Sequence, residues 1–317
     1  MIDVREALFM FNATAWKITA SLVLAALIVT AGGLAQASPL SDADTQRVTI
    51  PAGDVELGAT LYRPAGASGD LPAIVTAHGS AATTRDGVGF YTNAALSMGF
   101  AVLSFDKRGT GESTGEYVPF SVATSDRVFH DLAWDVAHSV QWLVNQEGID
   151  ATRIGLFGGS QAGWIMPLAD TLLRDNTDIR LDFIIIGEGV PLTAGAEQAH
   201  DDALRQSVGT RAQLQRQDLF AAEAGAIGFG GETGFDPASV LDATDTPMLW
   251  LFGLSDGVIP VLASIDRLGA RIEAGETHHT VRVLPYGDHN FTNTTTGERY
   301  DIAAISRAWL ISLGVLD

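Results

Sequence analysis

The chain has 317 residues, with 38 acidic and 19 basic side chains, a formal net charge of −19, 46% hydrophobic residues and no cysteine. The negative charge repels phosphate backbones and anionic lipid headgroups, which disfavours nucleic-acid binding and membrane attachment through a basic patch. A sequence without cysteine excludes disulfides, a thiol nucleophile and cysteine-ligated metals. We therefore expect a fold held by packing and no nucleic-acid partner.

The first 37 residues have the pattern of a secretory signal peptide. An apolar run at 18–34 follows Lys17, and the small residues Ala35 and Ala37 match the pattern that signal peptidase recognises. We expect a mature chain of residues 38–317 that is exported, periplasmic or secreted, and not bound to a membrane. The alternative is an uncleaved membrane anchor, because about 20 apolar residues can span a bilayer.

Beyond residue 40, short apolar runs rich in Val, Ile and Phe alternate with segments of helical periodicity. This alternation is typical of an α/β protein with a parallel sheet flanked by helices. An antiparallel pair at 47–53 and 55–64 is predicted to open the sheet. Six further strands are predicted at 72–79, 100–109, 153–160, 181–189, 247–256 and 279–288, which makes eight. Helices are predicted at 87–98, 125–146, 161–173, 259–274 and 299–314.

The helix predicted at 125–146 has one apolar face that would cover the sheet. Asp131, Asp135 and His138 fall away from that face, and His130 and His138 are expected at the surface. A different segment breaks the alternation, because about 50 residues rich in helix formers and then in glycine follow the fourth parallel strand. This stretch, about 191–245, predicts a helical cap over the carboxyl edge of the sheet, with a mobile glycine-rich arm.

The sequence Gly158-Gly-Ser-Gln-Ala-Gly163 stands between a predicted strand and a predicted helix. A serine at such a turn is held in a strained conformation that needs small neighbours, here Gly158 and Ala162, and its hydroxyl projects above the sheet. The backbone N–H of Gln161 then lies at a helix N-terminus, where it can stabilise a developing oxyanion. Ser160 is therefore the candidate nucleophile.

A serine nucleophile needs a histidine base that is oriented by a carboxylate. Asp256 ends one predicted strand and His289 follows the last one, so both belong to the edge that carries Ser160. The rival bases His278 and His279 lie at the start of the last strand, at the opposite edge. Asp288 is a rival acid, but a residue next to the histidine usually cannot fold back onto its Nδ1.

The loop after the first parallel strand, His78-Gly79-Ser80, is predicted to supply the second oxyanion donor through the Ser80 N–H. His78 is interpreted as a structural hydrogen-bonding residue. The segment 104–113 reads as a glycine turn after a strand, and we interpret Asp106 and Arg108 in it as an ion pair.

Taken in order, these segments resemble the α/β-hydrolase superfamily, most closely its bacterial serine esterases and its prolyl-oligopeptidase-like or dienelactone-hydrolase-like branch. The resemblance covers 47–315 and rests on the segments at 77–80, 104–113, 158–163, 253–260 and 286–291. It implies an α/β-hydrolase fold, the triad Ser160, Asp256 and His289, and an oxyanion hole from the N–H groups of Ser80 and Gln161. It also implies no cofactor, and no metal is predicted. Ala162 departs from the glycine that the family usually has there.

The predicted function is a carboxylesterase, a serine hydrolase that cleaves small-molecule carboxylic esters through an acyl-enzyme. The alternatives are a serine peptidase or aminopeptidase with the same triad, a thioesterase, and a binding protein that has kept the fold. Four aromatic side chains are candidates to line a pocket for short or medium acyl chains: Trp164, Phe229, Phe235 and Phe291.

Overall fold

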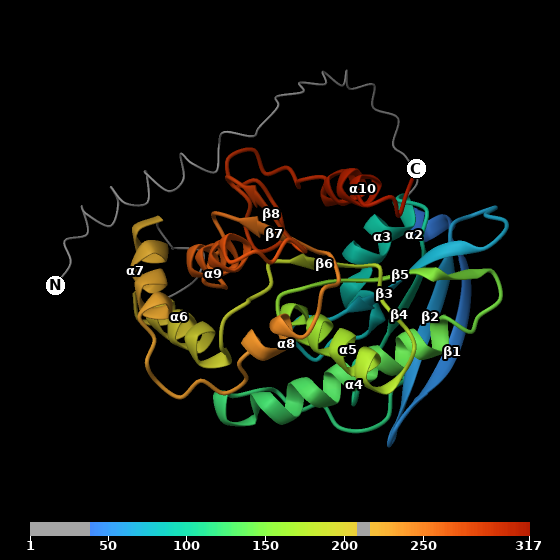
Figure 1. The fold of residues 1–317 in the computed structure, drawn as a ribbon, viewed down its shortest axis with the longest axis horizontal. Coiled ribbons are helices and arrows are strands. Elements are labelled where there is room, and N and C mark those ends of the chain that lie inside the picture. Colours follow the sequence, from blue (N-terminus) through green and yellow to red (C-terminus); the bar gives the residue numbers. More distant parts are fainter. Residues whose placement is uncertain (1–38, 208–215) are drawn as a thin grey trace. The chain divides into compact units, whose positions relative to one another are not determined.

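The computed structural model describes residues 39–207 and 216–317, so the predicted signal peptide lies outside the described residues. The strands of the described part are β1 (Asp44–Ala52), β2 (Val55–Arg63), β3 (Leu71–Ala77), β4 (Ala101–Phe105), β5 (Ile149–Gly159), β6 (Phe183–Gly187), β7 (Met248–Gly253) and β8 (His279–Leu284). They form one sheet in the order β1-β2-β4-β3-β5-β6-β7-β8 (Figure 1). β2 is antiparallel to both β1 and β4, and the pairs from β4 onward are parallel.

Helices cover both faces of this sheet. In chain order the described helices are α2 (Pro39–Asp42), η2 (Arg85–Val88), α3 (Gly89–Ser97), η3 (Val122–Thr124), α4 (Ser125–Leu143), α5 (Ala162–Asn176), α6 (Ala194–Ser207), α7 (Arg216–Ile227), α8 (Ala238–Asp242), α9 (Val261–Glu273) and α10 (Ile302–Ser312). The core beneath α3 and α10 is separate from the larger core beneath α4, α5, α8 and α9. The sheet is therefore the middle layer of three.

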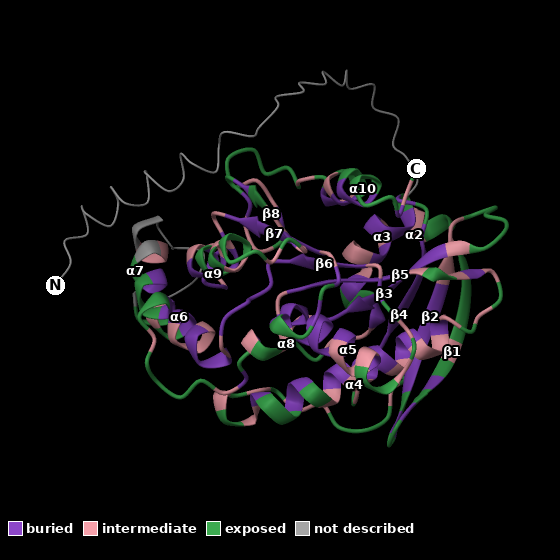
Figure 2. Ribbon diagram, viewed as in Figure 1, coloured by how far each residue is buried: buried purple, intermediate pink, exposed green. Residues whose placement is uncertain are grey.

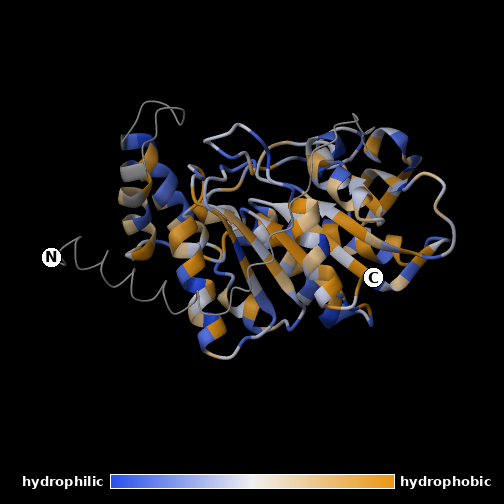
Figure 3. Cartoon of the chain, turned by 90° about the horizontal axis from the view of Figure 1, so that it is seen from above, coloured by the Kyte–Doolittle hydropathy of each residue, from blue (hydrophilic) through white to orange (hydrophobic). Residues whose placement is uncertain are grey.

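The strands in the middle of the sheet are buried on both faces. Every residue of β4, β6 and β7 is buried, whereas the edge strands β1 and β8 are partly exposed. Figure 2 shows the same contrast between the buried central strands and the exposed outer sides of the helices, and in Figure 3 the central strands are largely hydrophobic. A strand covered on both sides has no polar face, which is why these segments appear in the sequence as continuous apolar runs.

The predicted α/β-hydrolase architecture is confirmed. Each of the eight predicted strands is present, and so are the five predicted helices. β1 and β5 begin three and four residues earlier than predicted, and the other main differences lie at the carboxyl ends of the strands, where β4 and β8 each end four residues earlier than predicted. Those residues form the loops of the candidate site. None of the helices in the described ranges is long and apolar enough to cross a membrane.

The interpretation of Asp106 and Arg108 as an ion pair is wrong. Asp106 binds Arg85, which donates from Nε at 2.9 Å and from Nη2 at 2.7 Å. Arg108 instead binds Asp135 of α4, with two contacts of 2.7 Å. The turn after β4 sends the two side chains to different partners, each more than 20 residues away in the sequence.

Asp135, which was predicted to fall away from the apolar face of this helix, is nevertheless buried. Its side chain is fully buried, because the loop that carries Arg108 packs over that side of α4. His130 is exposed as predicted, and His138 is half-buried. Helical periodicity located the face toward the sheet but carried no information about a second layer on the other side.

The segment between β6 and β7 contains α6, α7 and α8, in the part of the chain predicted as a cap. In Figure 1, α6 and α7 lie beside α9 at the end of the sheet that carries β8. The end of the glycine-rich stretch is held in place, because Phe235 is buried, packs edge-on against Phe129 of α4 and donates its N–H to Ser125 Oγ at 2.8 Å.

Candidate active site

Ser160 occupies the sharp turn between β5 and α5. Its φ is +57°, a left-handed conformation that is uncommon for a residue with a side chain and that clusters at functional sites. The Ser160 N–H donates to the carbonyl of Gly187 at the end of β6, at 2.9 Å. This hydrogen bond ties the turn to the neighbouring strand, so the strained conformation is supported by the sheet.

Small residues around Ser160 allow the turn to pack closely. A Cβ at Gly158 would lie 2.5 Å from the Ala77 carbonyl oxygen and 2.9 Å from the Ala162 methyl group. A Cβ at Gly163 would lie 2.7 Å from the Cα of Gly189. Ala162 fits where related proteins usually have glycine because its methyl group occupies the space that Gly158 leaves open.

Asp256 and His289 come together as predicted. His289 Nδ1 lies 2.7 Å from Asp256 Oδ2, and the Val258 N–H donates to Oδ1 at 2.7 Å. Asp256 is 4% exposed, so its carboxylate is oriented on both oxygens and shielded from water. A carboxylate placed this way holds the imidazole in the tautomer that carries its proton on Nδ1, in which Nε2 is the basic nitrogen.

The loops that carry these two residues are joined through their backbones. The Leu254 N–H donates to the Leu284 carbonyl at 3.0 Å, and the Ser255 N–H donates to the Gly287 carbonyl at 2.8 Å. A Cβ at Gly253 would lie 2.3 Å from that Gly287 oxygen. The Asp256 loop and the His289 loop therefore form one backbone unit.

The rival residues have other roles. Asp288 Oδ1 accepts the N–H groups of Asn290 and Thr292 at 2.9 and 2.8 Å, so it stabilises the turn that presents His289. His279 begins β8 and His278 directly precedes it, at the opposite edge of the sheet from His289.

Within the described ranges, Glu276, His278 and His279 form a group with the spacing of metal ligands. Trp250 Nε1 donates to His279 Nδ1 at 3.3 Å, which leaves the proton of the neutral ring on Nε2, where a metal would need a lone pair. Burial lowers the pKa of His279 to about 3, so the ring is neutral. Arg271 Nε also binds Glu276, at 2.8 Å. The group is therefore better explained as a polar network than as a metal site.

Two backbone N–H groups beside Ser160 match the predicted oxyanion donors. Within the described part of the chain, neither the Ser80 N–H nor the Gln161 N–H donates to a protein acceptor. Gly79, directly before Ser80, is close to the nucleophile, because a Cβ there would lie 3.6 Å from Ser160 Cβ. Donors left free next to a nucleophile are what stabilisation of a tetrahedral intermediate requires.

Side chains that the sequence did not single out hold the loop of Ser80. Lys107 Nζ donates to the carbonyls of Gly79 and Ala81, and the Tyr117 hydroxyl donates to the carbonyl of Ser80. His78 is buried and packs edge-on against Phe105 at 4.9 Å between ring centroids, in agreement with a structural role. Burial, with the Lys107 charge nearby, lowers the pKa of His78 to about 3, so His78 is neutral.

Glu188 is a second acidic residue that sequence reasoning missed. It follows β6 with a φ of +48°, is 1% exposed, and accepts the Gly253 N–H on Oε1 at 2.8 Å. Burial raises the pKa of Glu188 well above its ordinary value, and the neighbouring Asp256 raises it further. Glu188 thus links the ends of β6 and β7 through a carboxyl group whose burial favours the protonated form. The signal that could have found it is an acidic residue at the end of a fully apolar strand.

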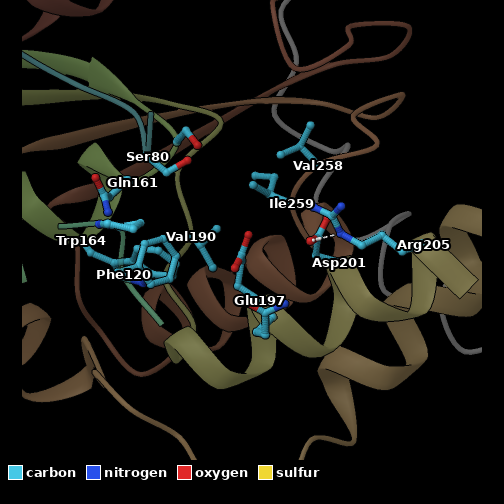
Figure 4. A pocket seen from close by; sticks show the side chains of 13 residues that line it. Ser80, Phe120, Gln161, Trp164, Val190, Glu197, Asp201, Arg205, Val258 and Ile259 are labelled. Carbon is cyan, nitrogen blue, oxygen red and sulfur yellow. Dashed lines mark hydrogen bonds and ion pairs between the residues drawn. The ribbon is translucent and has the colours of Figure 1, made fainter. Parts of the chain in front are cut away.

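A pocket of about 350 Å³ opens over Ser160. Figure 4 shows Ser80, Gln161, Trp164 and Phe120 at one end of it and the Asp201–Arg205 ion pair of α6 at the other, with Glu197 between them. The full lining is Ser80, Pro119, Phe120, Ser160, Gln161, Trp164, Val190, Glu197, Gln198, Asp201, Arg205, Val258 and Ile259. The pocket therefore has an apolar part near the nucleophile and a charged part on α6.

Of the four aromatic residues predicted to line a pocket, Trp164 does so in this part of the chain. The other three candidates do not line this pocket. Phe291 is fully buried beneath Phe90 in the core under α3, Phe235 packs on α4, and Phe229 packs at the edge of the larger core. Phe120, which precedes η3, takes their place in the lining.

The fold and the site define the class: the chain is a serine hydrolase of the α/β-hydrolase fold. The sequence pattern of the X-Pro dipeptidyl-peptidase (S15) family matches residues 53–226, more than half of the 317 residues. The chain therefore belongs to this family. The matched part includes Ser160 and the oxyanion loop and ends before Asp256 and His289.

Other comparisons agree on the fold. An uncharacterized protein of Pseudomonas aeruginosa is 28% identical over 192 residues, 57% of this chain and 49% of that protein. The acylamino-acid-releasing enzyme of Mus musculus is 31% identical over 115 residues, 35% of this chain and 15% of the enzyme. The chain thus matches about half the length of the first relative and less of the second.

Among solved structures, an esterase of Pyrococcus furiosus superposes with a TM-score of 0.61 at 16% identity, over 89% of this chain and 96% of the esterase. A hyperthermophilic esterase of Pyrobaculum calidifontis gives 0.60 at 18%, over 86% of each chain. An acylaminoacyl peptidase of Pyrococcus horikoshii gives 0.58 at 16%, over 86% of this chain and 42% of the peptidase.

Proposed function

We propose that the protein hydrolyses carboxylic esters of small alcohols and short or medium acyl chains, with Ser160 as nucleophile, His289 as base and Asp256 as the acid that orients it. The observation that carries this proposal is the 2.7 Å contact between His289 Nδ1 and Asp256 at the sheet edge where Ser160 stands beside two free N–H donors. The esterases among the structural neighbours support it.

In the first half of the reaction, His289 Nε2 takes the hydroxyl proton while Ser160 Oγ attacks the ester carbonyl carbon. The carbonyl oxygen becomes an oxyanion that accepts the N–H groups of Ser80 and Gln161. The C–O bond to the alcohol then breaks, and His289 returns its proton to the leaving alkoxide. In the second half, His289 activates water, which attacks the acyl-enzyme and releases the acid.

The pocket supports short or medium acyl chains because its apolar surface is small. Trp164 and Phe120 lie at the end near the nucleophile, and Val258 and Ile259 lie nearer to the Asp201–Arg205 pair (Figure 4). A volume of about 350 Å³ is at the lower end for a small-molecule site. A higher kcat/KM for long-chain than for short-chain p-nitrophenyl esters would refute this part of the proposal.

The test is hydrolysis of p-nitrophenyl acetate, butyrate and octanoate by the wild type and by Ser160→Ala, together with fluorophosphonate labelling. We expect turnover of the short esters, labelling of Ser160, and a loss of roughly 10⁶-fold in kcat for the variant. Ser312→Ala, a change in α10 away from the site, is the matched control. No labelling of the wild type and no ester turnover would contradict the proposal.

A peptidase that acts on free N-termini is a second candidate, favoured by one observation. Glu197 of α6 lines the pocket between the nucleophile and the Asp201–Arg205 pair, where a carboxylate could receive an ammonium group of the substrate (Figure 4). The S15 family match and the acylaminoacyl peptidase neighbour support this candidate.

The two candidates separate in the Glu197→Gln variant. For a peptidase, the variant should lose roughly 10-fold or more in kcat/KM on aminoacyl and dipeptidyl p-nitroanilides, since a charge-assisted hydrogen bond is lost, and little on uncharged esters. Gln198→Ala, which changes a neutral neighbour in the same lining, is the control. A wild type that cleaves no anilide excludes this second function.

A further inference from the structure

One buried cation behind the pocket has no part in the mechanism described so far. Lys107 is 2% exposed and follows β4, and it is the only lysine after residue 17 of the chain. Burial of an ammonium group is costly unless hydrogen bonds replace its water. The hydrogen-bond partners of Lys107 therefore indicate which segments its ammonium group holds in place.

Lys107 has three acceptors, the number of N–H bonds that an ammonium group carries. Nζ lies 2.5 Å from the Gly79 carbonyl oxygen, 3.0 Å from the Ala81 carbonyl oxygen and 3.2 Å from Gln161 Oε1. Two of these acceptors enclose Ser80 in the sequence, and the third belongs to the residue after Ser160. One ammonium group thus contacts both segments that supply the oxyanion donors.

The first contact determines where the Ser80 N–H points. In a trans peptide the carbonyl of one residue and the N–H of the next point in opposite directions. Because the Gly79 carbonyl points to Lys107, the Ser80 N–H points away from it, and Gly79 itself packs against Ser160. The Tyr117 hydroxyl holds the following carbonyl, that of Ser80, so the rotation of the loop is fixed at successive peptides.

The third contact acts on the other donor. Gln161 is 3% exposed, and its amide oxygen is held by Lys107 while its backbone begins the turn into α5. The distance between the two donors is therefore set through a single group that touches neither the substrate nor Ser160.

We propose that Lys107 is the positioning residue of the oxyanion hole: its ammonium group holds the Ser80 and Gln161 N–H groups at the separation that the tetrahedral intermediate requires. This inference rests on the proposed esterase function. Lys107 acts through the loop and is not itself a catalytic residue.

Deprotonation of Lys107 should loosen the hole, because a neutral amine has two N–H bonds for three acceptors. Burial lowers the pKa of Lys107 to about 8. The charged or titratable groups around it are constant near this pH. His78 is neutral, the flanking Asp106 and Arg108 are each held in an ion pair, and burial raises the pKa of Tyr117.

Activity and stability should respond in opposite directions above pH 8. The activity falls as the third hydrogen bond is lost. Between pH 8 and the ordinary lysine pKa of 10.5, the unfolded chain keeps a proton that the folded chain has released, so the contribution of Lys107 to the free energy of unfolding rises with pH. If Lys107 served only to stabilise the loop, the activity would not fall while the free energy of unfolding rises.

The kinetic test compares Lys107→Met and Lys107→Arg with the wild type on p-nitrophenyl butyrate, with the exposed Arg180→Met as control for the change in charge. We expect Lys107→Met to lose about 10²-fold in kcat, the effect of one oxyanion donor, with KM within about twofold. The affinity for a trifluoromethyl ketone, whose adduct places an oxyanion in the hole, should fall in parallel. Wild-type kcat and inhibitor affinity in Lys107→Met would overturn the proposal.

The second test does not depend on whether Lys107→Met folds. In the full chain labelled with [¹³C]lysine, two side-chain signals are expected, and Lys17→Arg identifies the one from Lys107. This signal should titrate near pH 8, in the pH range where the wild-type kcat decreases. The kcat of Lys107→Arg should not decrease in that range. A wild-type kcat that stays constant while the Lys107 signal titrates would overturn the proposal.

The outcome for Lys107 is independent of the outcome for the esterase function. A wild type that neither turns over esters nor reacts with fluorophosphonate contradicts the proposed function. A wild type that does both, next to an equally active Lys107→Met, overturns the positioning role alone.

Discussion

The carboxyl edge of the sheet and the face of α6 meet at the same pocket, but they are built differently. At the sheet edge, the side chains of Asp256, Lys107 and Gln161 are almost fully buried, and each is hydrogen-bonded to a neighbouring loop or side chain. On α6, Glu197 and Gln198 are half-buried and Arg205 is exposed. A transition state is stabilised by groups that do not reorganise, whereas substrate choice tolerates groups that can adapt.

This contrast assigns the chemical step to the sheet edge and selectivity to α6. Changes at the edge should lower the activity on all substrates by the same factor. Changes on α6 should alter the ratio between substrates, as expected above for Glu197. The following predictions test whether that division holds.

The largest effect is expected at the edge, in Asp256→Asn. The amide can present an N–H to His289 Nδ1, which favours the tautomer with its proton on Nε2 and removes the base. We expect kcat to fall by about 10⁴-fold on p-nitrophenyl acetate and on butyrate alike. Asp288→Asn, which changes the turn and not the triad, should lose far less. A substrate-dependent loss in Asp256→Asn would break the proposed division.

A second change lies behind the edge and should affect stability. In Asp135→Asn, Arg108 remains in its place without the carboxylate that it binds at two points. Removing one partner of a buried ion pair costs about 3–5 kcal/mol, and we expect a loss of this order in the free energy of unfolding measured with urea. Asp131→Asn on the same helix removes the exposed pair with Arg127 and should cost less than about 1 kcal/mol. Equal losses in the two variants would contradict the assignment.

The smallest effect is expected where the segment between β6 and β7 docks onto the edge. Glu223 of α7 accepts the N–H groups of Leu262 and Ala263 at the start of α9, at 2.8 and 3.0 Å. Burial raises the pKa of Glu223 from 4.5 to about 7, in spite of these hydrogen bonds. Between these values the folded chain holds a proton that the unfolded chain has lost, so the stability contributed by Glu223 decreases as the pH rises from about 5 to 7.

Denaturation of Glu223→Gln at pH 5 and pH 8 measures this contribution. The difference in the free energy of unfolding between the wild type and the variant should be smaller at pH 8. The exposed Glu232→Gln in the same segment is the control. A difference that grows with pH would show that the carboxylate, and not the acid, is the form that the docking contact favours.

The hydrophobic periodicity of the segments and the turn residues between them were sufficient to predict the sheet and its flanking helices. They also predicted the positions of Ser160, Asp256 and His289. These signals are local, because a buried strand is a continuous apolar run and a strand-to-helix turn requires small residues. Contacts between distant segments were not predictable in the same way. Arg85 binds Asp106, Arg108 binds Asp135, and Lys107 binds the loop of Ser80, and no residue pattern marks any of these pairs.

The burial of the aromatic side chains was also not predictable from the sequence. A phenylalanine in a loop has the same appearance in the sequence whether it lines a pocket or fills the core, as Phe120 and Phe291 do here. The depth of a side chain depends on which layer covers it, and that is a property of the assembled fold.

The joined backbones of the Asp256 and His289 loops have a consequence for loop exchange among homologues. The segments 253–260 and 284–291 share hydrogen bonds and a contact that leaves no room for a side chain at Gly253. A chimaera that imports one of them alone would pair a foreign loop with a native one across this contact. The two segments must therefore be exchanged together. They behave as one structural unit although about 25 residues separate them in the chain.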